Sequence, residues 1–212
     1  MTTTRSRQRQ KSDRRTYGED SRELILKAAR KLFARRGLHE TSMSDIAQEA
    51  RVSRATVFNQ FGSKHLVLDA ITARTLEGYC HLLDLALSDE SATTADLVRR
   101  TFGEMARRLE ANRALYREIF GEIRKISMGL EAEGESPALR RKAFDLLVRM
   151  FQRGQTRGEL ARTHSPGVLA NAFDSLLAGA ITQWLQDRQK AALRPLLQAF
   201  AEVLLAGVLR RD

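Results

Sequence analysis

The sequence predicts an all-α chain in which an N-terminal three-helix domain precedes a C-terminal helical bundle, with about nine helices in total. Two observations predict this class. Apolar residues recur at helical spacing in successive segments, and the chain has only three prolines and no alternating β-branched runs. A length of 212 residues, of which 42% are hydrophobic, is enough for one large or two modest domains with real cores.

Basic residues are concentrated near the N-terminus. The net charge is +10, and residues 1–65 carry 15 Lys and Arg against 7 Asp and Glu, whereas residues 66–212 carry 21 against 19. Charge confined to one end indicates a face that binds a polyanion. Residues 1–18 hold almost nothing to bury, so we predict a disordered basic arm. It either follows DNA phosphates or enters the minor groove, or it is a solvated tail.

Residues 21–36 form the first predicted helix. Asp20 and Glu23 are spaced as a capping box at its start, and Gly37 supplies a left-handed stop at its end. Its buried stripe follows helical spacing. The stripe comprises Leu24, Ile25, Ala28, Ala29, Leu32 and Phe33.

Residues 42–61 predict two short helices joined by a tight turn. Ser42 caps the first helix with Asp45 completing a capping box, and Ser53 caps the second. The second helix is polar, and only Val57 and Phe61 point inward. This helix-turn-helix is the unit that places a helix in the DNA major groove, so residues 19–66 are predicted to be a DNA-binding domain.

The rest of the chain, residues 67–212, is predicted to be a helical bundle. Serine followed by proline at 136–137 and 165–166 marks two helix starts, because proline is tolerated in a first turn. The acidic segment 129–135 predicts a loop. The helices are predicted at about 64–87, 94–111, 112–128, 137–157, 166–188 and 192–210.

The last two predicted helices carry broad apolar faces. These faces either pack within one bundle or form a four-helix seam with a second copy of the chain. We predict the homodimer, because a symmetric dimer doubles the base contacts at half-sites roughly 34–36 Å apart. The predicted dimer interface comprises Leu169, Phe173, Leu177, Ile181, Leu197, Phe200 and Leu204.

The segment around residues 20–70 resembles the DNA-binding domain of TetR-family transcriptional regulators. The resemblance rests on Ile25, Ala28-Ala29, Leu32-Phe33, Gly37, Thr41-Ser42-Met43, Asp45-Ile46-Ala47, Ala50, Val52-Ser53, Thr56-Val57-Phe58, Phe61 and Ser63-Lys64 in fixed register. It implies a homodimer whose residues 67–212 form an effector-binding and dimerisation domain. It also implies repression of a palindromic operator, relieved by a small-molecule effector. The chain departs from the family pattern at Phe58, where tyrosine is frequent, and at His65, where an acid is common.

Candidate DNA contacts follow from the helix-turn-helix. Thr41 and Ser42 lie at a helix start, which favours phosphate, although both are equally candidates for simple caps. Lys64 is a phosphate anchor by resemblance. Arginine suits guanine edges, Asn or Gln suits adenine, and a methyl group suits thymine. The predicted DNA-binding set is Thr41, Ser42, Ser53, Arg54, Ala55, Thr56, Phe58, Asn59, Gln60 and Lys64.

Large side chains in the bundle are candidates for an effector cavity. For any single one of them an ordinary core position is the more common role, and they identify no class of ligand beyond a largely hydrophobic one. The candidates are Phe102, Met105, Tyr116, Phe120, Phe144, Phe151 and Trp184.

Other functions find little support in the sequence. The four histidines are scattered, Cys80 and His81 fall on different faces of a helix, and no metal-binding or Gly-rich phosphate motif is present. We therefore expect no enzyme, cofactor or metal. With one cysteine, no signal peptide and no long apolar run, a cytoplasmic location is predicted. The alternative function is a constitutive architectural or nonspecific DNA-binding protein whose bundle is purely structural.

Overall fold

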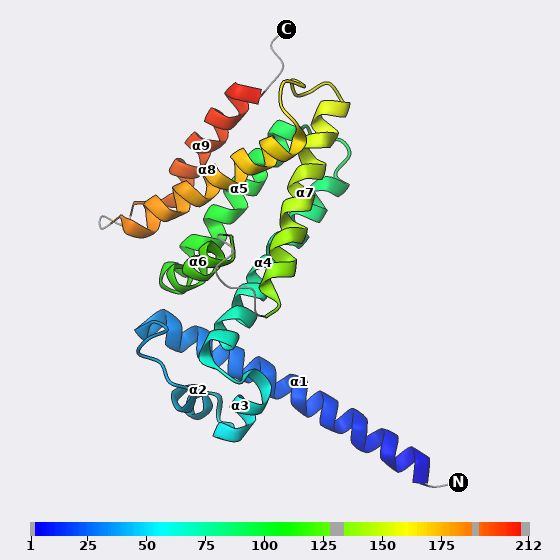
Figure 1. Ribbon diagram of the computed structural model, residues 1–212, viewed down its shortest axis with the longest axis vertical. Coiled ribbons are helices and arrows are strands. Elements are labelled where there is room, and N and C mark those ends of the chain that lie inside the picture. Colours follow the sequence, from blue (N-terminus) through cyan, green and yellow to red (C-terminus); the bar gives the residue numbers. More distant parts are fainter. Residues whose placement is uncertain (1–2, 128–133, 188–190, 209–212) are drawn as a thin grey trace.

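The computed structural model describes residues 3–127, 134–187 and 191–208, and within these ranges it has nine helices and no strand (Figure 1). The predicted all-α class is confirmed. The helices are α1 (Thr3–Arg36), α2 (Met43–Ala50), α3 (Arg54–Phe61), α4 (Lys64–Ser88), α5 (Thr94–Glu110), α6 (Arg113–Ser127), α7 (Ser136–Thr156), α8 (Pro166–Gln186) and α9 (Leu193–Val208). None of the described helices is long and apolar enough to cross a membrane.

The N-terminal core forms where α1 crosses α2, α3 and the start of α4 (Figure 1). Ile25 and Val57 are buried in it as predicted, together with Ile46, whereas Leu24 of the predicted stripe is 50% exposed. Gly37 ends α1 with a φ of 81°, as its position predicted. Leu115 and Ile119 of α6 join this core, so it includes a helix from far along the chain.

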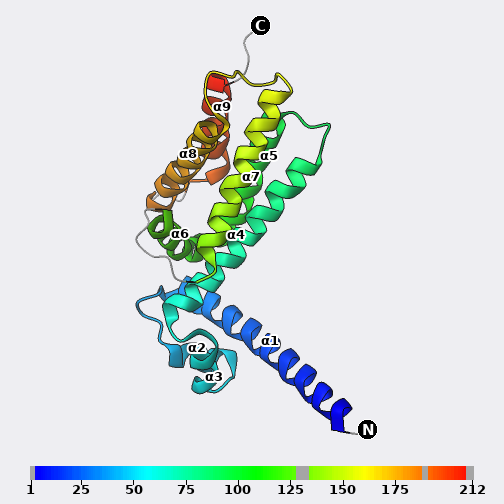
Figure 2. The same cartoon turned by 45° about the vertical axis from the view of Figure 1, so that its right-hand side comes forward.

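Helix α1 is longer than predicted. It begins at Thr3 rather than near Ser21, and its N-terminal half projects beyond the other helices (Figures 1 and 2). The segment predicted to be a disordered arm therefore continues the helix. Arg, Lys and Gln are good helix formers, and no proline interrupts residues 3–36. The helix can therefore begin well before its first apolar residues. The capping box predicted from Asp20 and Glu23 is wrong, because both lie inside α1.

The C-terminal bundle has its own core, built from α4, α5, α7, α8 and α9. Phe173 lies at its centre, with its ring 4.8 Å from that of Phe102 in an edge-to-face arrangement and 6.1 Å from that of Phe151. Helix α4 begins in the N-terminal core and rises along the bundle beside α7 (Figure 2). The two cores are thus joined by the continuous helix α4 and by α6.

Most predicted helix starts are confirmed. Ser165 caps α8, and Thr93 caps α5 in a capping box with Asp96. The start of α7 differs, because Ser136 is already helical and the cap residue supplies no side-chain bond. Instead, the buried carboxylate of Asp69 on α4 accepts hydrogen bonds from the backbone N–H of residue 135, at 2.7 Å, and from the Ser136 hydroxyl. A residue distant in sequence thus caps α7, which no local pattern could indicate.

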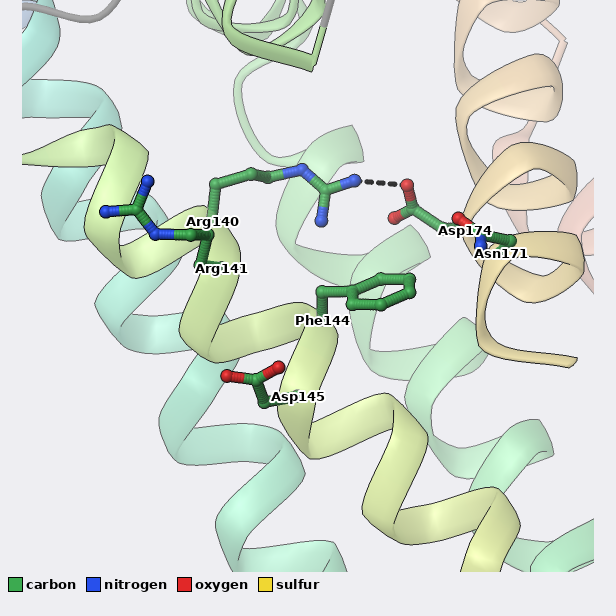
Figure 3. Close-up of a pocket in the computed structure, with 6 residues that line it drawn as sticks. All are labelled: Arg140, Arg141, Phe144, Asp145, Asn171 and Asp174. Atoms are coloured by element: carbon green, nitrogen blue, oxygen red, sulfur yellow. Dashed lines mark hydrogen bonds and ion pairs between the residues drawn. The ribbon is translucent and has the colours of Figure 1, made fainter. Parts of the chain in front are cut away.

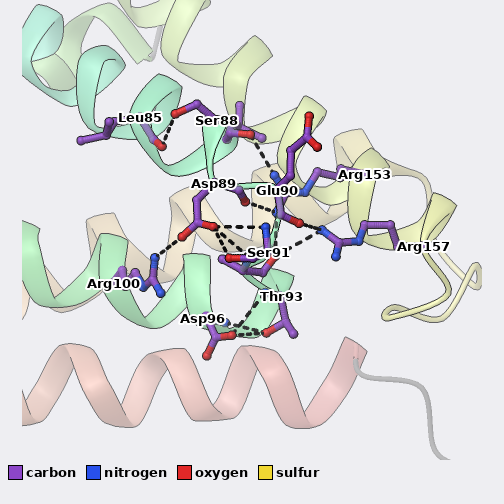
Figure 4. Close-up of polar contacts among 12 residues, drawn as sticks. Leu85, Ser88, Asp89, Glu90, Ser91, Thr93, Asp96, Arg100, Arg153 and Arg157 are labelled. Carbon is purple, nitrogen blue, oxygen red and sulfur yellow. Dashed lines mark hydrogen bonds and ion pairs between the residues drawn. The ribbon is translucent and has the colours of Figure 1, made fainter.

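The turn between α4 and α5 is held from α7 (Figure 4). The guanidinium of Arg153 donates to the carbonyl oxygens of Leu87, Asp89 and Ala92 at 2.7–3.0 Å. The Asp89 carboxylate accepts from Ser91 and Arg100, which hold its pKa at about 2. These contacts fix the end of the bundle that lies farthest from the helix-turn-helix. The predicted loop at 129–135 lies largely outside the described residues, as do the predicted helix ends beyond 127 and 208.

Candidate functional site

Helices α2 and α3 are fixed by caps at both starts. The Ser42 hydroxyl accepts from the backbone N–H of Asp45 at 3.1 Å, and the backbone N–H of Ser42 donates to the Asp45 carboxylate at 2.9 Å, which confirms the predicted capping box. This backbone bond, together with the Ser42 hydroxyl, holds the pKa of the Asp45 carboxyl below its usual range. Ser53 caps α3, and Arg51 between them takes a left-handed φ of 57°. The turn is therefore tightly determined.

Helix α3 exposes a polar face. Arg54, Ala55 and Asn59 are exposed, and Phe58 is 39% exposed with the Arg54 guanidinium 5.2 Å from its ring centre. Because Val57 and Phe61 alone of this helix are buried, nearly the whole outer side is available to a partner. Of the predicted DNA-binding residues, Arg54, Ala55 and Asn59 are thus exposed on this outer side.

Other predicted DNA contacts are engaged within the chain. The hydroxyl of Thr41, which is 1% exposed, donates to the carbonyl oxygen of Gly37, so it is a poor phosphate ligand. The Gln60 amide donates to Ser21 of α1 at 2.8 Å. Ser53 and Thr56 share a hydrogen bond at 2.8 Å across the start of α3, and Ser42 stays exposed at the start of α2.

Lys64 also faces inward rather than toward a partner. Its ammonium donates to the carbonyl oxygens of Leu38, His39 and Thr41 at 3.0, 3.1 and 3.3 Å. An ammonium has three N–H groups, so these contacts use its whole capacity. Lys64 therefore ties the start of α4 to the connection between α1 and α2, and its predicted role as a phosphate anchor has no support in this arrangement.

A largely apolar cavity of about 250 Å³ lies within the bundle. Tyr79 of α4 is 7% exposed, and its hydroxyl has no hydrogen-bond partner among the described residues. Burial, followed by the nearby Asp174 charge, raises the pKa of this hydroxyl, so it stays protonated. The lining comprises Thr75, Leu76, Tyr79, Met105, Phe120, Ile123, Arg124, Arg140, Asp174, Ser175, Leu177, Ala178 and Ile181.

Only part of the predicted effector set lines this cavity. Met105 and Phe120 do, whereas Phe144 lines a second hollow outside it and Tyr116 packs between the two cores. The others are core residues: Phe102, Phe151 and Trp184. The sequence reasoning missed Tyr79, Arg140 and Asp174, whose only signal was a polar residue on an otherwise apolar helix face.

The second hollow, of about 440 Å³, opens on the outer side of α7 and α8 (Figure 3). Arg140 reaches from α7 toward α8 and is ion-paired with Asp174, above the ring of Phe144 (Figure 3). The side chains of the pair are only 16% and 26% exposed. Both residues also line the inner cavity, so the ion pair stands between the two spaces.

The residues predicted to form the dimer interface are mostly internal. Phe200 is half-buried, but the other six are buried within the single chain, so they have no surface to offer a second copy. Leu177 and Ile181 line the cavity instead. The outer sides of α8 and α9, which lie next to one another, carry different residues: Val168 is 52% exposed and Val203 67% exposed.

Helix α6 connects the cavity with the helix-turn-helix unit. Phe120, Ile123 and Arg124 line the cavity, whereas Ile119 is buried in the N-terminal core. The carboxylate of Glu118 accepts from the backbone N–H of Leu38, at the end of α1, at 3.1 Å. One short helix therefore touches both candidate sites.

No catalytic arrangement is evident among the described residues. Cys80 is buried, its thiol contacts the carbonyl oxygen of Leu139, and burial raises the pKa of the thiol. A nucleophilic cysteine needs the opposite shift. Within the same part of the chain, no three His, Cys, Asp or Glu side chains are grouped to hold a metal ion.

Comparison with known proteins identifies the helix-turn-helix. Residues 25–71 match the family model described as bacterial regulatory proteins, tetR family. The chain is 27% identical over 183 residues to the HTH-type transcriptional regulator TtgR of Pseudomonas putida, covering 81% of this chain and 84% of TtgR. It is 23% identical to LuxR of Vibrio harveyi over 188 residues, covering 85% and 86% of the two chains.

Solved structures share the whole architecture. FadR of Bacillus subtilis, in complex with stearoyl-CoA, superimposes with a TM-score of 0.76 at 19% identity, covering 87% of this chain and 98% of FadR. FadR of Thermus thermophilus, in complex with lauroyl-CoA, gives 0.66 at 25% identity, covering 90% and 96%. These structures show that the chain shares their fold. The family match and the relatives of similar length identify the chain as a TetR-family bacterial transcriptional regulator.

Proposed function

We propose that the protein is a repressor that binds a palindromic operator as a homodimer and is released by a small molecule held in the inner cavity. The observation that carries the proposal is the double contact of α6, which lines the cavity with Phe120 and is buried in the N-terminal core through Ile119. Residues 19–66 would act as the DNA-binding domain and residues 67–212 as the effector-binding and dimerisation domain.

For the DNA contact, α3 enters the major groove with Arg54, Ala55 and Asn59 toward the bases. Their exposure and the cap at Ser53 support this role, since a helix held at its start presents its N-terminal residues to base edges. Ser42, Thr56 and Phe58 contact the backbone around it. The basic helical extension at residues 3–18 adds phosphate contacts that depend strongly on salt.

Release follows from a shift of α6. A ligand that displaces Phe120 or Ile123 moves α6, and neighbouring residues of α6 pack against α1. Because Glu118 bonds the backbone at Leu38, movement of α6 is passed to the connection that Lys64 also holds. The ligand needs only a higher affinity for the shifted state than for the DNA-binding state.

Dimerisation uses the outer sides of α8 and α9. The exposed Val168 and Val203, with the exposed Gly179 and the half-buried Leu176 and Phe200, form a stripe with helical spacing on these neighbouring helices. Apolar and small residues at such positions suit a close four-helix contact. We also propose a cytoplasmic location, because a regulator of this kind acts where the DNA is.

The similar structures support a ligand response. Two FadR proteins hold acyl-CoA molecules, and the SmeT complex, at 21% identity, holds triclosan. These ligands share a large apolar part, which agrees with the apolar lining of the cavity here. We propose no catalytic activity, because the relatives are regulators and Cys80 is buried as a protonated thiol.

The decisive experiment measures specificity. The purified protein is used to select binding sequences from random DNA, and its affinity for the selected site and for scrambled DNA is compared at fixed salt. A regulator binds its site about 10³-fold or more tightly, with two-fold symmetry in the site. A ratio near one would instead favour the architectural DNA-binding protein, which is the second candidate function.

A further inference from the structure

The inner cavity and the outer hollow meet at one ion pair, and the groups around it differ in chemistry from the rest of the lining. Arg140 and Asp174 line both spaces, while the remainder of the cavity is mostly apolar. We infer that the cavity binds an anionic amphipathic ligand. The ligand enters past the Arg140–Asp174 ion pair, and the protein holds it through the ligand's own carboxylate. This inference rests on the proposed function, since it names the ligand class of that same cavity.

The charge balance favours an anion. The cavity lining has two guanidinium groups, Arg124 and Arg140, against the single carboxylate of Asp174. Within the described chain Arg124 has no carboxylate partner, and Arg140 donates one hydrogen bond, to Asp174. A guanidinium has five N–H donors, so Arg140 keeps capacity for a second carboxylate. A cationic head would add to the excess positive charge.

Tyr79 supplies a second, independent observation. Its side chain is more than nine-tenths buried, lines the cavity and leaves its hydroxyl without a partner among the described residues. Buried hydroxyls nearly always have a hydrogen-bond partner, so an unpaired one on a residue that lines a cavity is a candidate partner for a ligand oxygen. The hydroxyl remains a donor at neutral pH, which matches an acceptor oxygen on the ligand.

The position of the ion pair defines the route. Arg140 extends from α7 toward α8 across the boundary between the outer hollow and the cavity (Figure 3). An incoming carboxylate can exchange for that of Asp174 on the same guanidinium, which opens the contact between α7 and α8 without leaving Arg140 unpaired. The apolar body then lies against Leu76, Met105 and Phe120.

The test compares three probes of equal chain length: octanoate, 1-octanol and octylamine. Binding to the full-length protein is measured by titration calorimetry, without DNA. Octanoate is expected to bind at least about tenfold more tightly than the other two, the ratio expected for one charge-assisted hydrogen bond. Tighter binding of octylamine or octanol would overturn the inference and leave the cavity itself intact. Failure of all three probes would also overturn it, whereas the loss of operator specificity described above would overturn the proposed function.

Variants assign the effect to residues. Arg140→Gln should weaken octanoate about tenfold or more and leave 1-octanol unchanged, whereas Asp174→Asn should tighten octanoate roughly threefold by removing the competing carboxylate. Tyr79→Phe, which removes only the hydroxyl, should weaken octanoate roughly fivefold. Arg149→Gln, an exposed arginine on the same helix, is the matched control. Equal octanoate affinity in Arg140→Gln and Arg149→Gln, with both melting normally, would contradict the assignment.

Discussion

Helices α3 and α8 each have a side proposed to meet a partner, but they reach that arrangement differently. Helix α3 buries only Val57 and Phe61 and turns its polar side chains outward. Helix α8 buries seven residues, some in the core and some in the cavity wall, and leaves small residues and Val168 outside. A helix held by its caps can thus present a whole face to a partner, whereas a helix at the centre of a bundle divides its surface among the core, the cavity wall and the exposed side.

The same contrast applies to how each helix is positioned. Local bonds fix α3: Ser53 at its start, Gly62 at its end and the bonds of Lys64 just beyond it. Distant residues position α8, through the ring of Phe102 and through Arg140 on α7. Mutations in α3 should therefore change recognition with little loss of stability, whereas mutations in α8 should change stability first.

The largest expected effect is in the α8 core. Phe173→Ala should lower the free energy of unfolding by about 3–5 kcal/mol, because it leaves a cavity between Phe102 and Phe151. Chemical denaturation checks the value. If Phe173 instead lay at a dimer interface, the loss would depend on protein concentration. A loss that vanishes at high concentration would contradict the core position.

A substitution on the outer side of α8 and α9 should have the opposite effect, with stability retained and the dimer weakened. Val203→Arg is expected to leave the fold of each chain intact, since the side chain is 67% exposed. It should weaken the dimer by about a hundredfold or more, because it places an unpaired charge in the proposed interface. Sedimentation at several concentrations measures the change, with Leu85→Arg on the exposed side of α4 as the control. A Val203→Arg protein that stays as dimeric as the Leu85→Arg control would place the interface elsewhere.

The contrast between local and distant contacts also shows what could be predicted from the sequence. The capping box at Ser42, the stop at Gly37 and the inward Val57 depend on neighbours within four residues, and these were predicted correctly. The box predicted at Asp20 and Glu23 was wrong, because α1 continues through both residues. The apolar stripe of α8 correctly predicted a helix, but periodicity cannot distinguish core, cavity and interface when all three sides are apolar. Asp69 capping α7 and Arg140 pairing with α8 depend on contacts 66 and 34 residues away, which a single sequence does not reveal.

An intermediate effect is expected at Lys64, where two roles can be separated. Lys64→Ala should destabilise the protein by about 1–2 kcal/mol through the lost bonds to backbone carbonyls. Because the ammonium is directed into the protein, the slope of log affinity against log salt should stay as in the wild type. A phosphate contact would reduce that slope by about one. Arg54→Ala provides the comparison for an exposed basic residue.

The smallest expected effect compares two matching caps. Ser42 and Thr93 each form a capping box with an aspartate three residues later, one at the start of α2 and one in the bundle. Replacing either with alanine should cost about 1 kcal/mol of stability, and the two melting temperatures should fall alike. Only Ser42→Ala should also weaken operator binding, since α2 packs against α3 and Ser42 is exposed at its start. In both boxes, bonds from the cap residue hold the aspartate pKa below its usual value. The stability from each is therefore present above the ordinary aspartate pKa and is lost as pH falls through the lowered one. Equal DNA affinity of the two variants at neutral pH would show that the start of α2 does not contribute to binding.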